Sequence, residues 1–193
     1  QFEKAESSAR RLRSLWALQV TGGLNQDRLL SLLDHSDEYI RSWSIQFLCD
    51  ASRANAFQDA RSVTRSPIAP AVLESFSSLA ENDTSPVVRL YLASAVQRLP
   101  FDDRWRILEG LVSHEEDNGD NNLPRMYWFG LEPMVPHYRS ESLKLALGGK
   151  ISTLQESVAR RLVTGTRAVS TSRESSSQHK QDPNWQWTLQ KVA

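Results

Sequence analysis

The sequence has one cysteine, no net charge and no long apolar run. The single cysteine, Cys49, excludes an internal disulfide and any Cys-x-x-Cys metal or haem site within these residues. The 23 basic and 23 acidic side chains cancel, so no field of one sign would steer in a nucleic acid or an anionic membrane surface. No run approaches the roughly 18 apolar residues of a membrane span. We therefore expect neither a nucleic-acid partner nor membrane insertion.

Sequence motifs of the common enzyme classes are also lacking. The chain has no Gly-x-Ser-x-Gly turn, no His-Glu-x-x-His zinc motif and no dinucleotide-binding fingerprint. Gly148-Gly149-Lys150 lacks the upstream glycine and the hydroxyl residue of a phosphate-binding loop. We therefore predict no catalytic residue.

Apolar residues recur every three to four positions along most of the chain, which is the period of an amphipathic helix. No stretch alternates apolar and polar residues with a period of two, so we predict an all-α fold. Residues 50–66 lose the helical pattern, which indicates a loop with an irregular turn. The expected helices cover residues 5–20, 26–33, 38–48, 67–80, 86–99, 103–112, 124–135, 141–147 and 151–163.

Three of the expected helices begin in a related way. Each has an apolar residue followed by an arginine, at Leu12-Arg13, Ile40-Arg41 and Val88-Arg89. Such self-similarity is typical of helical repeats, and these helix starts resemble those of HEAT repeats. We therefore predict a HEAT-like α-solenoid of paired antiparallel helices. In it, Arg13, Arg41 and Arg89 each bond a carboxylate or helix end of a neighbouring repeat.

The composition divides the chain into three parts. Residues 1–163 carry the helical pattern and form the expected repeat domain. Residues 164–182 are rich in serine and other polar residues, so we predict a flexible linker that buries too little apolar surface to order itself. Residues 183–193 include Trp185 and Trp187 and are interpreted as the start of a further element or as a tail docked onto the repeats. Because the first residue is glutamine and no signal segment follows, we expect a piece of a larger protein.

Six tryptophans raise the possibility of carbohydrate stacking. Trp16, Trp43 and Trp105, however, fall on the apolar faces of expected helices, and packing in the core explains them better. We make the same prediction for Trp128.

The most unusual stretch is a polar loop that leads into an aromatic helix, over residues 114–133. In one interpretation its oxygen atoms bind a hard cation such as calcium, which takes about six to eight oxygen ligands. The candidate ligands are Glu115, Glu116, Asp117, Asp120, Asn122 and Glu132. In the other interpretation the loop is a polar turn, in which Asp120, Asn121 or Asn122 caps the helix that Pro124 begins. The loop departs from the EF-hand pattern, because Gly119 stands at the wrong position.

A third use of this loop would employ His114 as a catalytic base or metal ligand. No second histidine lies near His114 in the sequence. The others, His35, His137 and His179, fall in expected turns or in the linker. We therefore place this use behind the other two.

Several motifs around the loop resemble one known family. They are His114-Glu115-Glu116-Asp117, Asp120-x-Asn122-Leu123-Pro124, and Trp128-Phe129-Gly130-Leu131-Glu132-Pro133, with flanking similarity at residues 11–18 and 150–162. Together they resemble the helical-repeat region of large PVC-type haem-binding proteins of Planctomycetes and Verrucomicrobia. Those proteins are described as membrane-bound or secreted dehydrogenases. The resemblance covers most of residues 5–163.

In that family a β-propeller precedes the repeats, and a c-type cytochrome domain with a Cys-x-x-Cys-His haem site follows them. Neither is present in these residues, because Cys49 has no partner cysteine and no adjacent histidine. The haem and the dehydrogenase chemistry are therefore not carried over to this chain. The resemblance implies a periplasmic or extracellular connector between the two domains.

We therefore expect a non-enzymatic scaffold, without a cofactor of its own, that contacts neighbouring domains of the same chain or another protein. One alternative is an accessory enzyme domain with a cation site in the loop 114–122. The other is a free-standing cytoplasmic HEAT-repeat scaffold.

Overall fold

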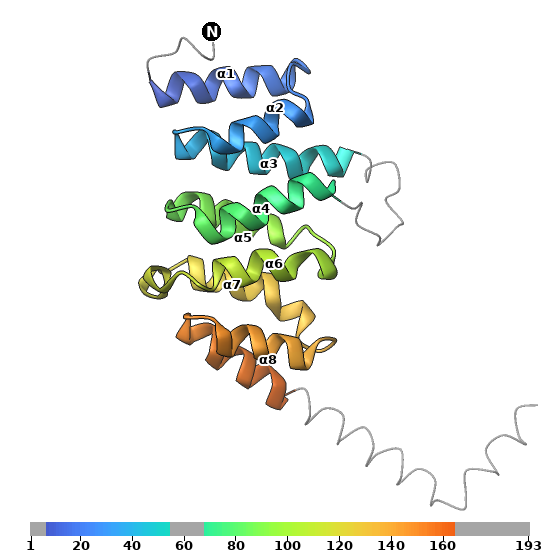
Figure 1. Cartoon of the computed structure of the whole chain (residues 1–193), viewed down its shortest axis with the longest axis vertical. Helices are drawn as coiled ribbons and strands as arrows, with labels where there is room; N and C mark the ends of the chain where they lie inside the picture. Colours follow the sequence, from blue (N-terminus) through green and yellow to red (C-terminus); the bar gives the residue numbers. More distant parts are fainter. Residues whose placement is uncertain (1–6, 55–67, 165–193) are drawn as a thin grey trace, which may run out of the picture.

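The computed structural model describes residues 7–54 and 68–164, and every regular element in these ranges is a helix (Figure 1). For this part of the chain the prediction of an all-α fold is confirmed. The α-helices are α1 (Ser8–Val20), α2 (Gln26–Ser31), α3 (Glu38–Ala54), α4 (Pro70–Asn82), α5 (Pro86–Val96), α6 (Phe101–Leu111), α7 (Leu123–Leu131) and α8 (Arg139–Gly148), and one more spans 152–164. Short 3-10 helices are η1 (Leu32–Asp34), η3 (Glu115–Gly119) and η4 (Glu132–Met134). None of the helices described here has both the length and the apolar character of a membrane span.

The helices follow one another along the longest axis of the molecule, from α1 at one end to the helix 152–164 at the other (Figure 1). Helix α3 packs against α1 on one side and α5 on the other, and α5 also packs against α7. Helix α6 packs against α4 in the same way. Helices two apart in sequence are therefore neighbours, so α1, α3, α5 and α7 form one row, which we call the odd-numbered row.

Buried apolar side chains form one connected core along the stack. Leu15 of α1, Ile45 of α3, Leu92 of α5 and Leu108 of α6 are all fully buried. These residues belong to the apolar faces predicted from the 3.6-residue period, or lie beside them, which explains why the helices pack in this order. Each helix thus buries its apolar face between its neighbours.

Several boundaries differ from the prediction. Helix α3 continues to Ala54, whereas the sequence indicated a loop from residue 50. Two side-chain contacts support the extra turn, because Gln46 donates to the Asp50 carboxylate four residues later and Arg98, in the turn after α5, also donates to it. Helix α4 begins at Pro70 rather than residue 67. Proline disfavours a helical conformation in the residue before it, and Ala69 is correspondingly extended.

The last described helix extends one residue into the predicted linker, which was expected to begin at residue 164. Helix 152–164 includes Thr164, which we had assigned to the linker. The rest of the linker and the segment with Trp185 and Trp187 lie outside the described residues, as do residues 55–66 of the expected loop.

The predicted burial of Trp16 is wrong. This side chain is 40 % exposed, and its ring packs edge-on against Trp43 at 4.9 Å between ring centroids. Helix α1 lies at the end of the described row, so no further helix covers Trp16 (Figure 1). Trp43, Trp105 and Trp128 are partly buried and pack against the core.

Cys49 lies in α3 and is 1 % exposed, and burial raises the pKa of its thiol to about 12. Because the thiolate is the reactive form, we predict that Cys49 of the folded protein does not react with a thiol-specific dye at neutral pH. An introduced control cysteine, Ala17→Cys on the exposed side of α1, should react within seconds to minutes. Rapid labelling of Cys49 in the native protein would show that α3 opens easily.

Candidate functional site

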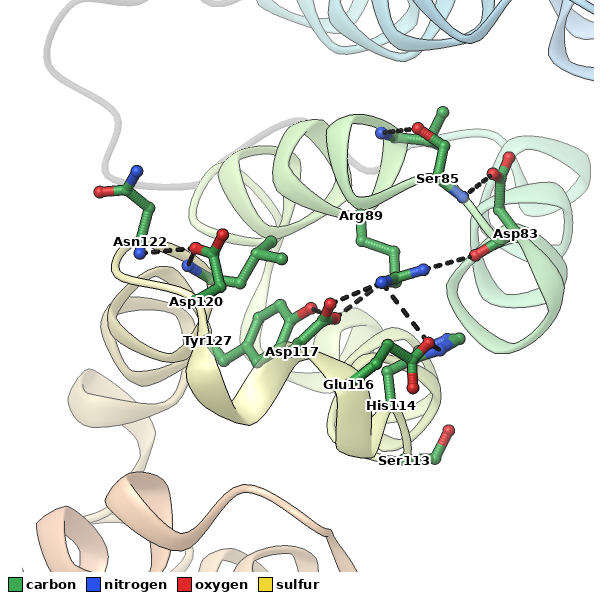
Figure 2. A network of polar contacts seen from close by, with 12 residues as sticks. Asp83, Ser85, Arg89, Ser113, His114, Glu116, Asp117, Asp120, Asn122 and Tyr127 are labelled. Carbon is green, nitrogen blue, oxygen red and sulfur yellow. Dashed lines mark hydrogen bonds and ion pairs between the residues drawn. The ribbon is translucent and has the colours of Figure 1, made fainter.

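The candidate site is the predicted polar loop, which lies between α6 and α7 and contains η3 (Figure 2). Asp117 of η3 is 2 % exposed, although it lies among exposed neighbours such as Glu116. A buried carboxylate is costly unless a cation or hydrogen bonds compensate its charge. The contacts of Asp117 therefore distinguish a cation site from a structural role of this loop.

The side-chain carboxylate of Asp117 accepts three hydrogen bonds. Arg89 of α5 donates from Nε to Oδ2 at 2.7 Å and from Nη2 to Oδ1 at 2.5 Å. The hydroxyl of Tyr127, on α7, donates to Oδ2 at 2.6 Å. Figure 2 shows the guanidinium and the phenol converging on the carboxylate from opposite sides. Arg89, Asp117 and Tyr127, which we call the Asp117 cluster, thus join α5, η3 and α7.

The electrostatics of this cluster favour a charged pair. Burial disfavours the charge on Arg89, but its hydrogen bond and attraction to Asp117 outweigh burial and raise the pKa of Arg89 above its ordinary value. Burial, followed by the hydrogen bond to Asp117, raises the pKa of Tyr127, so the phenol stays protonated and acts as a donor. A bidentate guanidinium–carboxylate pair of this kind is among the stronger polar contacts in proteins.

A second bidentate arginine–carboxylate pair, which we call an arginine link like that of Arg89 and Asp117, joins α3 to the segment before α5. Arg41 of α3 donates from Nε and Nη2 to the two carboxylate oxygens of Asp83, at 2.8 and 2.9 Å. In both links the remaining nitrogen, Nη1, donates to the backbone carbonyl six residues before the arginine. That carbonyl belongs to His35 for Arg41, at 2.8 Å, and to Asp83 for Arg89, at 2.9 Å. The two arginines thus occupy equivalent positions, and each reaches the segment that precedes the next helix of the odd-numbered row.

The third predicted arginine differs. Arg13 is exposed on α1 and makes no contact of this kind within the described residues. At the other end of the stack, the Asn118 side chain accepts from the backbone nitrogen and the hydroxyl of Ser152, at 3.2 and 3.1 Å. Loop 114–122 therefore contacts α5, which precedes it in the chain, and also the helix 152–164.

His114 and Glu116 complete the network at the edge of the cluster. Nε2 of His114 lies 2.9 Å from the carbonyl oxygen of Ala80, and Nδ1 lies 2.8 Å from Oε1 of Glu116. Glu116 also lies 3.5 Å from Nη2 of Arg89. His114 therefore ties the end of α4 to the loop, and both ring nitrogens are engaged in structural contacts rather than free for catalysis.

Asp120 performs the capping that the second interpretation assigned to the loop. Its Oδ1 accepts from the backbone nitrogens of Asn122 and Leu123, at 2.7 and 2.9 Å, where α7 begins. The side chain of Asn122 makes no capping bond, although Asn122 occupies the N-cap position. Glu115 is exposed and Glu132 is half-buried at the far end of α7.

The six predicted cation ligands are therefore not brought together. Within residues 7–54 and 68–164, no group of three or more histidine, cysteine, aspartate or glutamate side chains converges as metal ligands. Both oxygens of Asp117 are already used by Arg89 and Tyr127, so a cation would have to displace a buried guanidinium. Calcium binding in this loop remains a prediction that geometry does not favour.

We accordingly expect calcium at about 1 mM, the weak end of protein calcium sites, to leave the melting temperature unchanged. Calorimetric titration should give no saturable heat with the wild type or with Asp120→Ala. Saturable binding that Asp120→Ala abolishes would restore the cation interpretation.

The loop should also make stability depend on pH. A hydrogen bond from its own backbone and one from His114 lower the pKa of Glu116, and the backbone N–H groups of Leu123 and Asn122 lower that of Asp120. A carboxyl whose folded pKa is depressed stabilises the fold above its ordinary pKa, and that stability is lost as pH falls through the folded value. We predict that unfolding midpoints fall with pH below about pH 4.5, with a shallower fall for Asp120→Asn. Equal slopes for both proteins would contradict this role of Asp120.

The burial of Arg104 was missed by sequence reasoning. Arg104 of α6 is 1 % exposed and donates to the backbone carbonyls of Leu99, Gly130 and Gln97, at 3.0, 2.8 and 3.2 Å. Its guanidinium also lies 4.9 Å from the ring centre of Phe101. It follows acidic residues at the start of an ordinary amphipathic helix, so its sequence context is that of an exposed arginine.

A second feature missed from the sequence is a groove across the odd-numbered row. It has a volume of about 610 Å³ and is lined by residues of α3, α5 and α7 and by Asn122 just before α7. Its lining residues are Trp43, Gln46, Leu90, Tyr91, Ser94, Asn122, Arg125, Met126 and Phe129. We call it the aromatic groove.

Comparisons with protein-family models, with curated proteins and with solved structures give no match to this chain. The function is therefore inferred from the geometry of the loop, of the two arginine links and of the aromatic groove.

Proposed function

We propose that this chain is a non-enzymatic helical-repeat scaffold, a HEAT-like α-solenoid that holds neighbouring domains of a longer chain, or another protein, in a fixed arrangement. The observation that carries the proposal is the repeated arginine link, Arg41 to Asp83 and Arg89 to Asp117. Equivalent links at successive steps of a stack of helices are what repeat architecture predicts, because each unit contacts its neighbours through the same positions.

The packing of the helices supports this proposal. Helices two apart are neighbours along the odd-numbered row, and α4 packs against α6 beside it. The polar loop 114–122 supplies the Asp117 cluster and the cap of α7, which are both structural roles. A scaffold needs these contacts to hold its helices together.

The resemblance to the PVC-type haem-binding proteins supports a more specific form of the proposal. In that form the chain is an exported connector between a propeller domain and a cytochrome domain, and it holds no haem itself. The reading frame beyond residue 193 should then contain a Cys-x-x-Cys-His motif. A complete frame without that motif would leave a free-standing scaffold as the better description.

Rigidity of the stack is the property to test. Spin labels on Ala17→Cys in α1 and Ala159→Cys in the helix 152–164 lie at the two ends of the array, on exposed positions. The native Cys49 can stay, because its thiol is buried and burial raises its pKa to about 12, so we expect it not to react with the label. We expect a single narrow distance distribution by pulsed electron spin resonance.

The control is the same labelled pair in a protein with Arg41→Gln. This substitution removes the bidentate link to the buried Asp83, which keeps the hydrogen bond from the backbone nitrogen of Ser85, so the protein should fold with reduced stability and show a broader distribution. A broad distribution in the wild type would contradict a rigid scaffold.

A further inference from the structure

The aromatic groove is lined by both apolar and polar side chains. Trp43 of α3, Tyr91 of α5 and Met126 of α7 line it with half-buried side chains. The rings of Trp43 and Tyr91 are 6.1 Å apart between centroids. Phe129 projects from α7 and is 50 % exposed, which is unusual for a phenylalanine in a helix that packs on a core. An exposed phenylalanine beside two half-buried aromatic rings in one groove is typical of a binding surface rather than of a solvated face.

The aromatic surface is longer than the groove itself. Trp16 of α1, 40 % exposed, contacts Trp43, so aromatic side chains continue over all four helices of the odd-numbered row. Neighbouring helices pack about 8–10 Å apart, and three such steps span about 25–30 Å. An extended peptide rises about 3.3 Å per residue, so eight or nine residues would cover this distance. A small molecule would fill only one part of it.

The charge of the groove lining indicates which charge the ligand carries. Arg125 is the one charged residue among those that line the groove, and its side chain is exposed at the start of α7. A guanidinium of this kind favours a carboxylate, which it can bind with two parallel hydrogen bonds. The Asn122 amide and the Ser94 hydroxyl also line the groove and can pair with the backbone of a peptide.

We propose that the aromatic groove binds an extended peptide segment of another protein, with bulky apolar side chains on one face and an acidic residue opposite Arg125. This proposal depends on the proposed scaffold function and names the chemistry of the partner. Alternate residues of an extended chain point to the same side, so apolar residues at alternate positions would face Trp43, Tyr91 and Phe129 together.

The test is a selection of random nine-residue peptides, displayed on phage, against the full chain. We expect the enriched peptides to share large apolar residues at alternate positions and at least one Asp or Glu. A fluorescein-labelled peptide of the enriched sequence should then bind about tenfold more weakly to Phe129→Ser and to Arg125→Ser. Leu147→Ser is the matched control, because Leu147 is 68 % exposed on α8, outside the groove, and should leave binding unchanged.

Three results would overturn the proposal. The first is that no sequence is enriched over a selection against Phe129→Ser. The second is that the enriched peptides bind wild type, Phe129→Ser and Arg125→Ser equally. The third is that binding appears only after Trp185→Ser and Trp187→Ser, which would identify a segment of this chain as the occupant. In each case the spin-label distance distribution still reports on the scaffold independently, so failure of the groove and failure of the scaffold are distinguishable.

Discussion

Asp117→Ala is expected to destabilise the protein by roughly 3–5 kcal/mol, because it leaves the guanidinium of Arg89 buried without its carboxylate. For a chain of this size that loss lowers the melting temperature by about 6–20 °C. The Tyr127 hydroxyl also loses its acceptor, which adds to the loss. Thermal and urea unfolding followed by circular dichroism measure the effect.

Two further variants separate the charge from the rest of the cluster. Tyr127→Phe removes one hydrogen bond and keeps the ion pair, so it should cost only about 1 kcal/mol. Glu115→Ala is the matched control, since Glu115 lies in the same 3-10 helix but is exposed, and it should change stability by less than about 0.5 kcal/mol. Equal losses for Asp117→Ala and Glu115→Ala would show that Asp117 has no special role.

Gly110→Ala is expected to have the second large effect. A Cβ atom at Gly110 of α6 would lie 2.8 Å from the carbonyl carbon of Ala80 and 2.9 Å from the backbone nitrogen of Glu81, at the end of α4. Because both are backbone atoms, the two helices would have to separate. Alanine favours a helix over glycine by about 1 kcal/mol, but overpacking costs about 1–3 kcal/mol, so we expect a net loss of stability.

Gly148→Ala provides the comparison for this prediction. Gly148 also lies in a helix, at the end of α8, but a Cβ atom there would meet no atom within 4 Å. It should therefore be neutral or slightly stabilising, within about 0.5 kcal/mol. If Gly110→Ala is as harmless as Gly148→Ala, then α4 and α6 do not pack as closely as described.

The existence and order of the helices could be predicted from the sequence because they depend on a local period. Apolar residues such as Ile40 and Val88 recur along one face, and Pro86 begins a helix as predicted. The boundaries were less predictable, because contacts with distant residues set them. The last turn of α3 is supported by Arg98, 48 residues after Asp50, which no local pattern reveals.

The repeated positions of Arg41 and Arg89 predict that these arginines link neighbouring repeats. They do not predict which carboxylates the arginines bind. Asp83 and Asp117 follow these arginines by 42 and 28 residues, so no fixed spacing points to them. Asp117 also lies among several acidic residues of similar local context, and only the fold selects which one is buried. The aromatic groove was missed for the same reason, because exposure of Phe129 depends on which face of α7 meets α5.

A double-mutant cycle between Arg89 and Asp117 tests the central claim most directly, that loop 114–122 is a structural link between helices of a scaffold. The unfolding free energies of wild type, Arg89→Met, Asp117→Leu and the double variant give the coupling energy of the pair. We predict a coupling of about 2 kcal/mol or more, with the double variant more stable than either single one. A coupling near zero would contradict the account.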